Sequence, residues 1–234
     1  MRLVALLVRT WNLYHGRTVP PSGRTHLERM VRLIAGGGPD VVALQEVPVW
    51  ALDDLGRWSG MRPYGAVARP PRGGALGRRV TGLAPDLVRS AFSGQANALL
   101  LGGAVVADAP ERVVTLNPGA RLERRVCHVV PVRRNGERLT IGNLHATAHD
   151  HAAARLELVR VADELSVGGA ALVCGDFNVP ATGLDGFSAP IAGIDQIVVR
   201  ELEFERRPAT WPRDRRRLGR VLLSDHAPVE AVIR

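Results

Sequence analysis

Six polar motifs are spread along this sequence, and each lies at the end of an apolar run. In chain order they are Thr10-Trp11-Asn12, Leu44-Gln45-Glu46, Asn143-Leu144-His145, Gly175-Asp176-Phe177-Asn178, Ile194-Asp195-Gln196 and Ser224-Asp225-His226. Strand ends are places where a rigid sheet can hold catalytic groups at fixed separations. Carboxylates, amides and histidines suit a hard divalent metal beside a phosphate. The sequence therefore predicts an active site that is assembled from strand ends.

Four residues of these motifs are candidate metal or phosphate contacts. Asp176 and Asn178 are two residues apart, so both side chains point to one side if the strand continues. Such a pair can orient a metal-bound water and hold a phosphoryl oxygen, although Asp-x-Asn is equally common in turns. Glu46 ends a buried run, where a carboxylate is costly unless it binds a cation or forms an ion pair. Asn12 ends the first run and fits either a metal site or a turn.

Two of the seven histidines are candidates for proton transfer, because His145 and His226 follow apolar runs and have carboxylates within reach. A base that works near pH 7 needs a partner that fixes its tautomer, and Asp195 is the natural candidate for His226. The other five are expected elsewhere, namely His15 and His26 in a polar loop, His128 inside a strand, and His149 and His151 in solvent at a helix start.

The elements that must position these residues are mostly strands. Apolar runs bounded by turn residues predict strands over 3–10, 41–44, 98–101, 126–132, 139–143, 170–174, 197–199 and 229–233. Asn135-Gly136 predicts a hairpin, because both turn positions need a positive φ. Helices are expected over 26–35, 150–165 and, more weakly, 49–58, with Leu156, Val159 and Leu165 on one stripe of the second. Segments 69–85 and 206–220 are expected to be surface loops, and nothing divides residues 1–234 into domains.

Composition limits the class of protein. A chain of 234 residues with 46% apolar residues can bury a large core, and no apolar run is long enough to span a bilayer. The N-terminal run is too short for a secretory signal, so a cytoplasmic location is expected, with Cys127 and Cys174 as buried free thiols. The net charge of +8 comes from arginine without any lysine, which favours polyanionic partners such as nucleic acids and also indicates a coding bias.

The ordered motifs resemble those of the endonuclease/exonuclease/phosphatase superfamily over nearly the whole chain. The resemblance implies an α+β fold, a four-layer sandwich of two mixed sheets packed face to face with helices outside and the site at one edge. Carried over by matching motif, Glu46 would hold Mg²⁺, or alternatively Mn²⁺, with Asn12 and Asp225 as further ligands or supports. Asp176 and Asn178 would position the phosphate and the attacking water, or a second metal.

The same resemblance assigns the proton-transfer roles. His226, oriented by Asp195, would be the general base, and His145 would stabilise the transition state or protonate the leaving group. Glu123 resembles the acidic residue that pairs with this second histidine, and Asn97 resembles a residue that lines the site.

Three functions are weighed on this basis. The first is a metal-dependent nuclease, in which Arg215, Arg216 and Trp211 of segment 206–220 contact nucleic acid. The second is a phosphatase or phosphodiesterase for small-molecule or inositol phosphates, whose anions arginines bind equally well. The third is a non-catalytic binding module, which the intact motifs oppose. A histidine at position 145, where apurinic endonucleases usually have tyrosine, argues against an abasic-site enzyme, and no membrane or protein partner is indicated.

Overall fold

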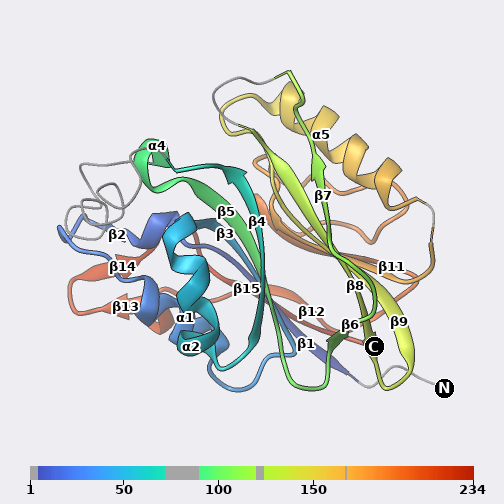
Figure 1. The fold of residues 1–234 in the computed structure, drawn as a ribbon, viewed down its shortest axis with the longest axis horizontal. Coiled ribbons are helices and arrows are strands. Elements are labelled where there is room, and N and C mark those ends of the chain that lie inside the picture. Colours follow the sequence, from blue (N-terminus) through green and yellow to red (C-terminus); the bar gives the residue numbers. More distant parts are fainter. Residues whose placement is uncertain (1–4, 72–89, 120–123, 167) are drawn as a thin grey trace.

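The computed structural model describes residues 5–71, 90–119, 124–166 and 168–234. Two six-stranded sheets pack against each other, and helices cover both outer faces, so the molecule has four layers (Figure 1). The strand order is β12-β15-β1-β3-β5-β4 in the first sheet and β11-β10-β9-β8-β6, with β7 also paired to β8, in the second. Within each sheet one central pair is parallel, β1 with β3 and β9 with β10, and the other pairs are antiparallel. The four-layer α+β sandwich expected from the sequence is confirmed.

The elements have the following bounds. The first sheet contains β1 (Leu6–Asn12), β3 (Val41–Val47), β4 (Arg62–Arg69), β5 (Gln95–Leu101), β12 (Phe204–Thr210) and β15 (Val229–Ile233). The second contains β6 (Val106–Ala107), β7 (Arg112–Thr115), β8 (Val126–Arg134), β9 (Glu137–His145), β10 (Ala171–Asp176) and β11 (Asp195–Arg200). A small sheet joins β2 (Thr18–Val19), β13 (Arg217–Leu218) and β14 (Val221–Leu223). The helices are α1 (Leu27–Ala35), α2 (Leu55–Ser59), α4 (Ser90–Ser93) and α5 (His151–Glu164), with 3₁₀ turns η1 (Tyr14–Gly16), η2 (Val49–Asp54) and η3 (Asp214–Arg216).

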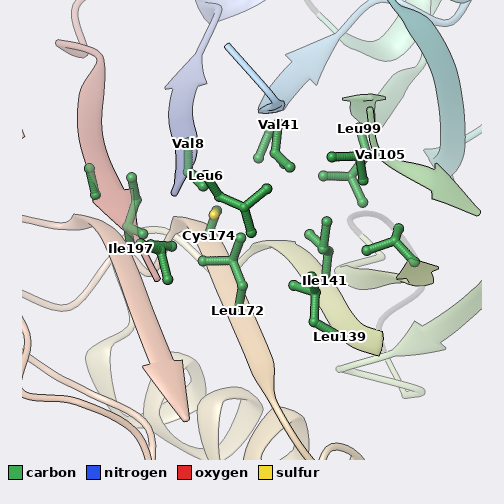
Figure 2. Packing of buried hydrophobic residues seen from close by; sticks show 14 of the residues in the cluster. Leu6, Val8, Val41, Leu99, Val105, Leu139, Ile141, Leu172, Cys174 and Ile197 are labelled. Atoms are coloured by element: carbon green, nitrogen blue, oxygen red, sulfur yellow. The ribbon is translucent and has the colours of Figure 1, made fainter. Parts of the chain in front are cut away.

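The main core lies between the two sheets and follows from the two-residue period of the strands. Leu6 and Val8 of β1 and Val41 of β3 point inward and meet Leu172 of β10 (Figure 2). Alternate residues such as Val42 point the other way, into a separate cluster beneath α1. Burying each such side chain stabilises the fold by about 1.5–3 kcal/mol. The apolar alternation therefore fixes which face of each strand looks into the sandwich.

The outer helix α5 buries a different stripe from the one expected. Leu156 and Val159 are 68% and 56% exposed, whereas Ala154, Leu158 and Val161 pack on the second sheet. The expectation was wrong for Leu156 and Val159, because it followed the bulkier side chains, whereas Leu165, the third residue of that stripe, is buried in the same cluster. The face of α5 that packs on the sheet carries the small Ala154 and the buried Glu157. The carboxylate of Glu157 accepts hydrogen bonds from Thr147.

Most of the other expected elements are present. All eight predicted strands are found within the described residues, and several are extended at one or both ends. The hairpin turn is confirmed, with φ of 50° at Asn135 and 87° at Gly136. Segment 206–220 is only partly a loop, because residues 206–210 belong to β12 and pair with β15. Most of segment 69–85 lies outside the described residues.

The two cysteines, Cys127 and Cys174, are buried free thiols, as expected. No described helix is long and apolar enough to cross a membrane.

Candidate active site

The strand ends that carry the polar motifs meet at one edge of the sandwich. On β10 the inward stripe of Leu172 and Cys174 continues into Asp176, which lies opposite His145 of β9 and Asp195 of β11. The two sheets are joined there, because Nδ2 of Asn12 donates a hydrogen bond of 3.0 Å to Oδ2 of Asp176. The layer between the sheets thus changes from apolar at its centre to polar at this edge.

His226 and Asp195 form a hydrogen-bonded pair at this edge. Nδ1 of His226 lies 2.9 Å from Oδ2 of Asp195, and its Nε2 lies 3.7 Å from Oδ2 of Asp176. Burial disfavours the charged ring, but the hydrogen bond and charge of Asp195, with the charges of Asp176 and Asp225, raise the pKa of His226 to about 10. Asp195 therefore keeps Nδ1 protonated and leaves Nε2 facing Asp176.

The hydrogen bonds of Ser224 explain why the Ser-Asp-His motif begins with a serine. It adopts a φ of 61°, and its hydroxyl donates to the carbonyl of Asn12 over 2.7 Å. The same oxygen accepts the backbone N–H of His226 over 3.0 Å, and the indole N–H of Trp11 donates to the His226 carbonyl. The loop that carries the histidine is thus held to the end of β1.

His145 lies on the other side of Asp176 and is neutral. Its Nδ1 is 2.9 Å from Nε2 of Gln95, and Nη1 of Arg125 is 3.1 Å from both ring nitrogens. Burial, followed by the charge of Arg125, holds the pKa of His145 well below its usual range. Because Gln95 donates to Nδ1, the ring proton is on Nε2, which lies 3.5 Å from Asp176 and 3.8 Å from Glu46. The ring presents a neutral N–H to the site.

Two carboxyls, those of the half-buried Glu46 and the buried Asp176, have unusually high pKa values. Burial raises the pKa of Glu46 to about 7, and the charges of Asp176 and Asp225 add to the rise. Burial, followed by the charge of Asp195, raises the pKa of Asp176 to about 6. Carboxylates that repel one another in a buried site are stabilised by a hard divalent cation, which prefers oxygen ligands. The residues present therefore fit a divalent metal.

A backbone irregularity directs the carboxyl of Glu46. The pairing of β3 with β5 shifts register between Leu44 and Val47, and Glu46 has a φ of 53°. This bulge turns Glu46 toward the site, although the strand alternation gives the inward position to Gln45, whose Nε2 donates to Thr10 and Asn143.

Asn178 and Asn97 each donate hydrogen bonds from their side-chain amides to the backbone. β10 ends at Asp176, Asn178 has a φ of 52°, and its Nδ2 donates to the carbonyl of Ala146. The strand does not continue, so Asp176 and Asn178 do not share a face as the sequence suggested. Asn97 is buried, and its Nδ2 donates to the carbonyls of Val126 and Asn143 between the sheets. Both amides position neighbouring strands.

Two of the three proposed substrate contacts in segment 206–220 are buried. Trp211 is 5% exposed, and the guanidinium groups of Arg9 and Arg215 lie 5.1 and 3.4 Å from its ring centre. Arg216 is also buried, and its Nη1 donates to the carbonyls of Leu223 and Ser224. Trp211 and Arg216 therefore stabilise the loop from within, whereas Arg215 is exposed. Glu123 lies outside the described residues.

Asp225 is exposed and lines a cavity of about 310 Å³ together with Asp195, His226 and Thr210. This cavity makes the His226–Asp195 pair accessible from solvent. Of the predicted residues, the structure thus brings together Asn12, Glu46, His145, Asp176, Asp195, Asp225 and His226.

Three further residues of the site were missed from the sequence. His15 was expected in a polar loop, but its Nε2 lies 3.4 Å from Oε2 of Glu46, and burial lowers the pKa of His15 to about 4. Gln95 and Arg125 contact His145. Gln95 had a usable signal, because it lies two residues before Asn97 on the same face of a strand. No sequence signal marked Arg125, because nothing distinguishes it from the adjacent Arg124.

The chain belongs to the Endonuclease/Exonuclease/phosphatase family, whose model matches residues 10–226. Members of this family are generally phosphoester hydrolases that use divalent metals. No curated protein matches the sequence at a significant level.

Solved structures share the fold at low identity. The endonuclease/exonuclease/phosphatase from Bacteroides vulgatus is 17% identical, with a TM-score of 0.72 over 99% of both chains. That from Beutenbergia cavernae DSM 12333 is also 17% identical, with a TM-score of 0.72 over 98% of this chain and 71% of the other. A D. rerio TDP2 humanized by 14 mutations is 16% identical, with a TM-score of 0.69 over 98% and 99% of the two chains.

Proposed function

We propose that this protein is a divalent-metal-dependent phosphodiesterase that cleaves nucleic acid by attack of an activated water on phosphorus. The observation that supports this most directly is the paired arrangement around Asp176. On one side His226 is oriented by Asp195 at 2.9 Å, and on the other the neutral His145 faces Glu46 at 3.8 Å. A base, a donor and buried carboxylates in one site are the groups that phosphoester hydrolysis needs.

Glu46 is the residue that we propose as the main metal ligand, with Asp225 beside it. When bound, Mg²⁺ would supply positive charge that polarises a phosphoryl oxygen. Asp176, Asp195 and His226 also offer ligand atoms within 4.8 Å of one another. His226 and Asp195 already satisfy each other, so we favour the set around Glu46. Both polar atoms of the Asn12 amide are engaged, by Asp176 and by the Tyr14 N–H, which suits a supporting role better than metal ligation.

The two histidines divide the proton chemistry between them. Nε2 of His226 would take the proton of the attacking water, while Asp195 stabilises the imidazolium that results. Positive charge placed among the carboxylates would lower the pKa of His226 toward the range in which a base works near neutral pH. His145, neutral and protonated on Nε2, would donate to a phosphoryl or leaving-group oxygen, and the buried Arg125 beside it would add positive charge.

A small-molecule phosphoester is the alternative substrate, and one observation favours it. Trp211 and Arg216 are buried in the fold, which removes two of the contacts that would favour nucleic acid in segment 206–220. The net charge of +8 favours the polyanion.

A substrate panel tests the proposal. Single-stranded and duplex DNA, RNA, bis(4-nitrophenyl) phosphate and inositol phosphates would be assayed with Mg²⁺, Mn²⁺ or EDTA, beside the His226→Ala variant. We expect Mg²⁺-dependent cleavage of nucleic acid that His226→Ala abolishes. Hydrolysis of inositol phosphates alone would favour the alternative, and activity undiminished in excess EDTA would refute a metal-dependent mechanism.

A further inference from the structure

A second cavity, of about 430 Å³, lies between α1 and the segment formed by η2 and α2. Its wall includes Arg29 and Arg32 of α1, Trp50 of η2 and Trp58 of α2, and we call it the tryptophan pocket. None of these four residues takes part in the site around Glu46.

Trp50 and Trp58 form an aromatic wall of the tryptophan pocket. Trp50 and Trp58 meet edge to face, with ring centres 6.5 Å apart and an interplanar angle of 84°. Trp58 is only 7% exposed, and neither indole N–H has an acceptor among the described residues. Both N–H groups are covered by surrounding atoms, so a ligand in the pocket would meet the ring carbons of the indoles.

The charge of the tryptophan pocket favours an anion. Arg32 donates to Oε1 of Glu28 from Nε at 3.0 Å and from Nη2 at 2.8 Å. Arg29 is exposed, and within the described part of the chain it has no ion-pair or hydrogen-bond partner. Two arginines beside one glutamate leave the wall positively charged. Aromatic rings next to arginine are the combination that binds nucleotides, because a base stacks and a phosphate pairs with the guanidinium.

The tryptophan pocket is connected to the catalytic site on two sides. Trp50 comes four residues after Glu46, a stretch of chain that spans at most about 14 Å. On the other side, the N–H of His26, at the start of α1, donates to the carbonyl of Gly16 over 2.8 Å. Gly16 follows His15, whose Nε2 lies 3.4 Å from Glu46. A polymeric substrate held at Glu46 can therefore reach the pocket within a few nucleotides.

We propose that the tryptophan pocket binds a nucleotide of the substrate strand that flanks the scissile phosphate. Its base lies against the indoles, and its phosphate pairs with Arg29. This inference rests on the proposed function and narrows it, because it makes the substrate an oligonucleotide rather than a small phosphoester.

Binding of a thymidylate hexamer to the His226→Ala protein tests the pocket without turnover. Trp50→Leu should raise Kd about tenfold, because stacking on an aromatic side chain contributes that much per base. Arg29→Gln should raise Kd less and reduce its salt dependence. The matched control is Arg160→Gln, which removes the same charge from the exposed face of α5. If both pocket variants bind like the control, the proposal is wrong.

Activity of the proteins that retain His226 separates this inference from the proposed function. The ratio of kcat/KM for the hexamer to kcat/KM for bis(4-nitrophenyl) phosphate should fall about tenfold in Trp50→Leu. An equal loss on both substrates would mean that the variant damages the catalytic site, and would overturn the inference. If thymidine monophosphate binds with the same Kd as the hexamer, the pocket is a separate effector site, and the inference is also overturned. If the parent protein cleaves no phosphodiester but the binding result holds, the proposed function fails and the pocket stands.

Discussion

At the scale of single residues, two histidines of the site are driven to opposite states by their neighbours. Asp195, Asp176 and Asp225 outweigh burial and raise the pKa of His226 to about 10. His145 has Arg125 beside it, so burial and that charge both keep it neutral. His226 is therefore the more basic of the two rings, and the charge of a bound cation would lower its pKa toward the range in which it can accept a proton near neutral pH.

The Asp195→Asn variant tests this difference. We expect kcat to fall about 10²–10⁴-fold, because the base loses the charge that stabilises its imidazolium. The acid limb of the pH–rate profile should move to lower pH, because removal of a negative charge lowers the pKa of His226. Steady-state kinetics from pH 5 to 9 would measure both effects. Asp185→Asn, at an exposed position in the segment before β11, is the control. A normal rate in Asp195→Asn would mean that His226 is not the base.

At the scale of elements, the approach of β10 to β9 depends on one glycine. Gly175 has a φ of 142°, and a Cβ there would lie 1.9 Å from the carbonyl oxygen of Leu144. Only glycine allows the two parallel strands to approach this closely and to place Asp176 opposite His145.

Gly175→Ala should therefore destabilise the protein by on the order of 3 kcal/mol, through a backbone clash and an unfavourable φ. Urea unfolding would measure the change. Gly186→Ala is the matched control, because Gly186 has a φ of 74° and open space around it, so it should lose only about 1 kcal/mol. Equal stabilities of the two variants would show that the close approach of the strands is not limiting.

At the scale of the whole molecule, the raised pKa of Glu46 couples folding to pH. Glu46 has its pKa raised to about 7, so in the range from its ordinary value of 4.5 to 7 the folded state binds more protons than the unfolded state. The contribution of Glu46 to stability is therefore fully present below about pH 4.5 and is lost as the pH rises toward 7.

In EDTA, the parent protein should lose on the order of 2 kcal/mol relative to Glu46→Gln as the pH rises from 4.5 to 7. Comparing the variant with the parent cancels the effects of other titrating groups, such as the buried His128. Added Mg²⁺ should stabilise the parent at pH 7 and leave Glu46→Gln nearly unchanged. Thermal unfolding at each pH, with EDTA and with Mg²⁺, would measure this. A pH-independent difference between the two proteins would contradict the raised pKa of Glu46.

Local patterns were sufficient for much of the fold and for one pairing within the site. Two-residue alternation and turn residues located the eight predicted strands, because strand position and the Asn135-Gly136 turn depend on neighbours in the chain. The order of the motifs indicated the family, and the pairing of His226 with Asp195 followed from the need of a base for an orienting partner.

The tertiary structure alone decided which side chains complete or leave the site. Asn12 and Asp176 are 164 residues apart in sequence, yet they hydrogen-bond across the two sheets. Arg125 reaches His145 and Trp211 is buried, although neither sequence context distinguishes these residues from exposed ones. Alternation specifies which face of a strand is apolar, but it does not specify what packs against that face. Contacts between distant segments depend on how whole layers pack, and that packing is absent from any local pattern.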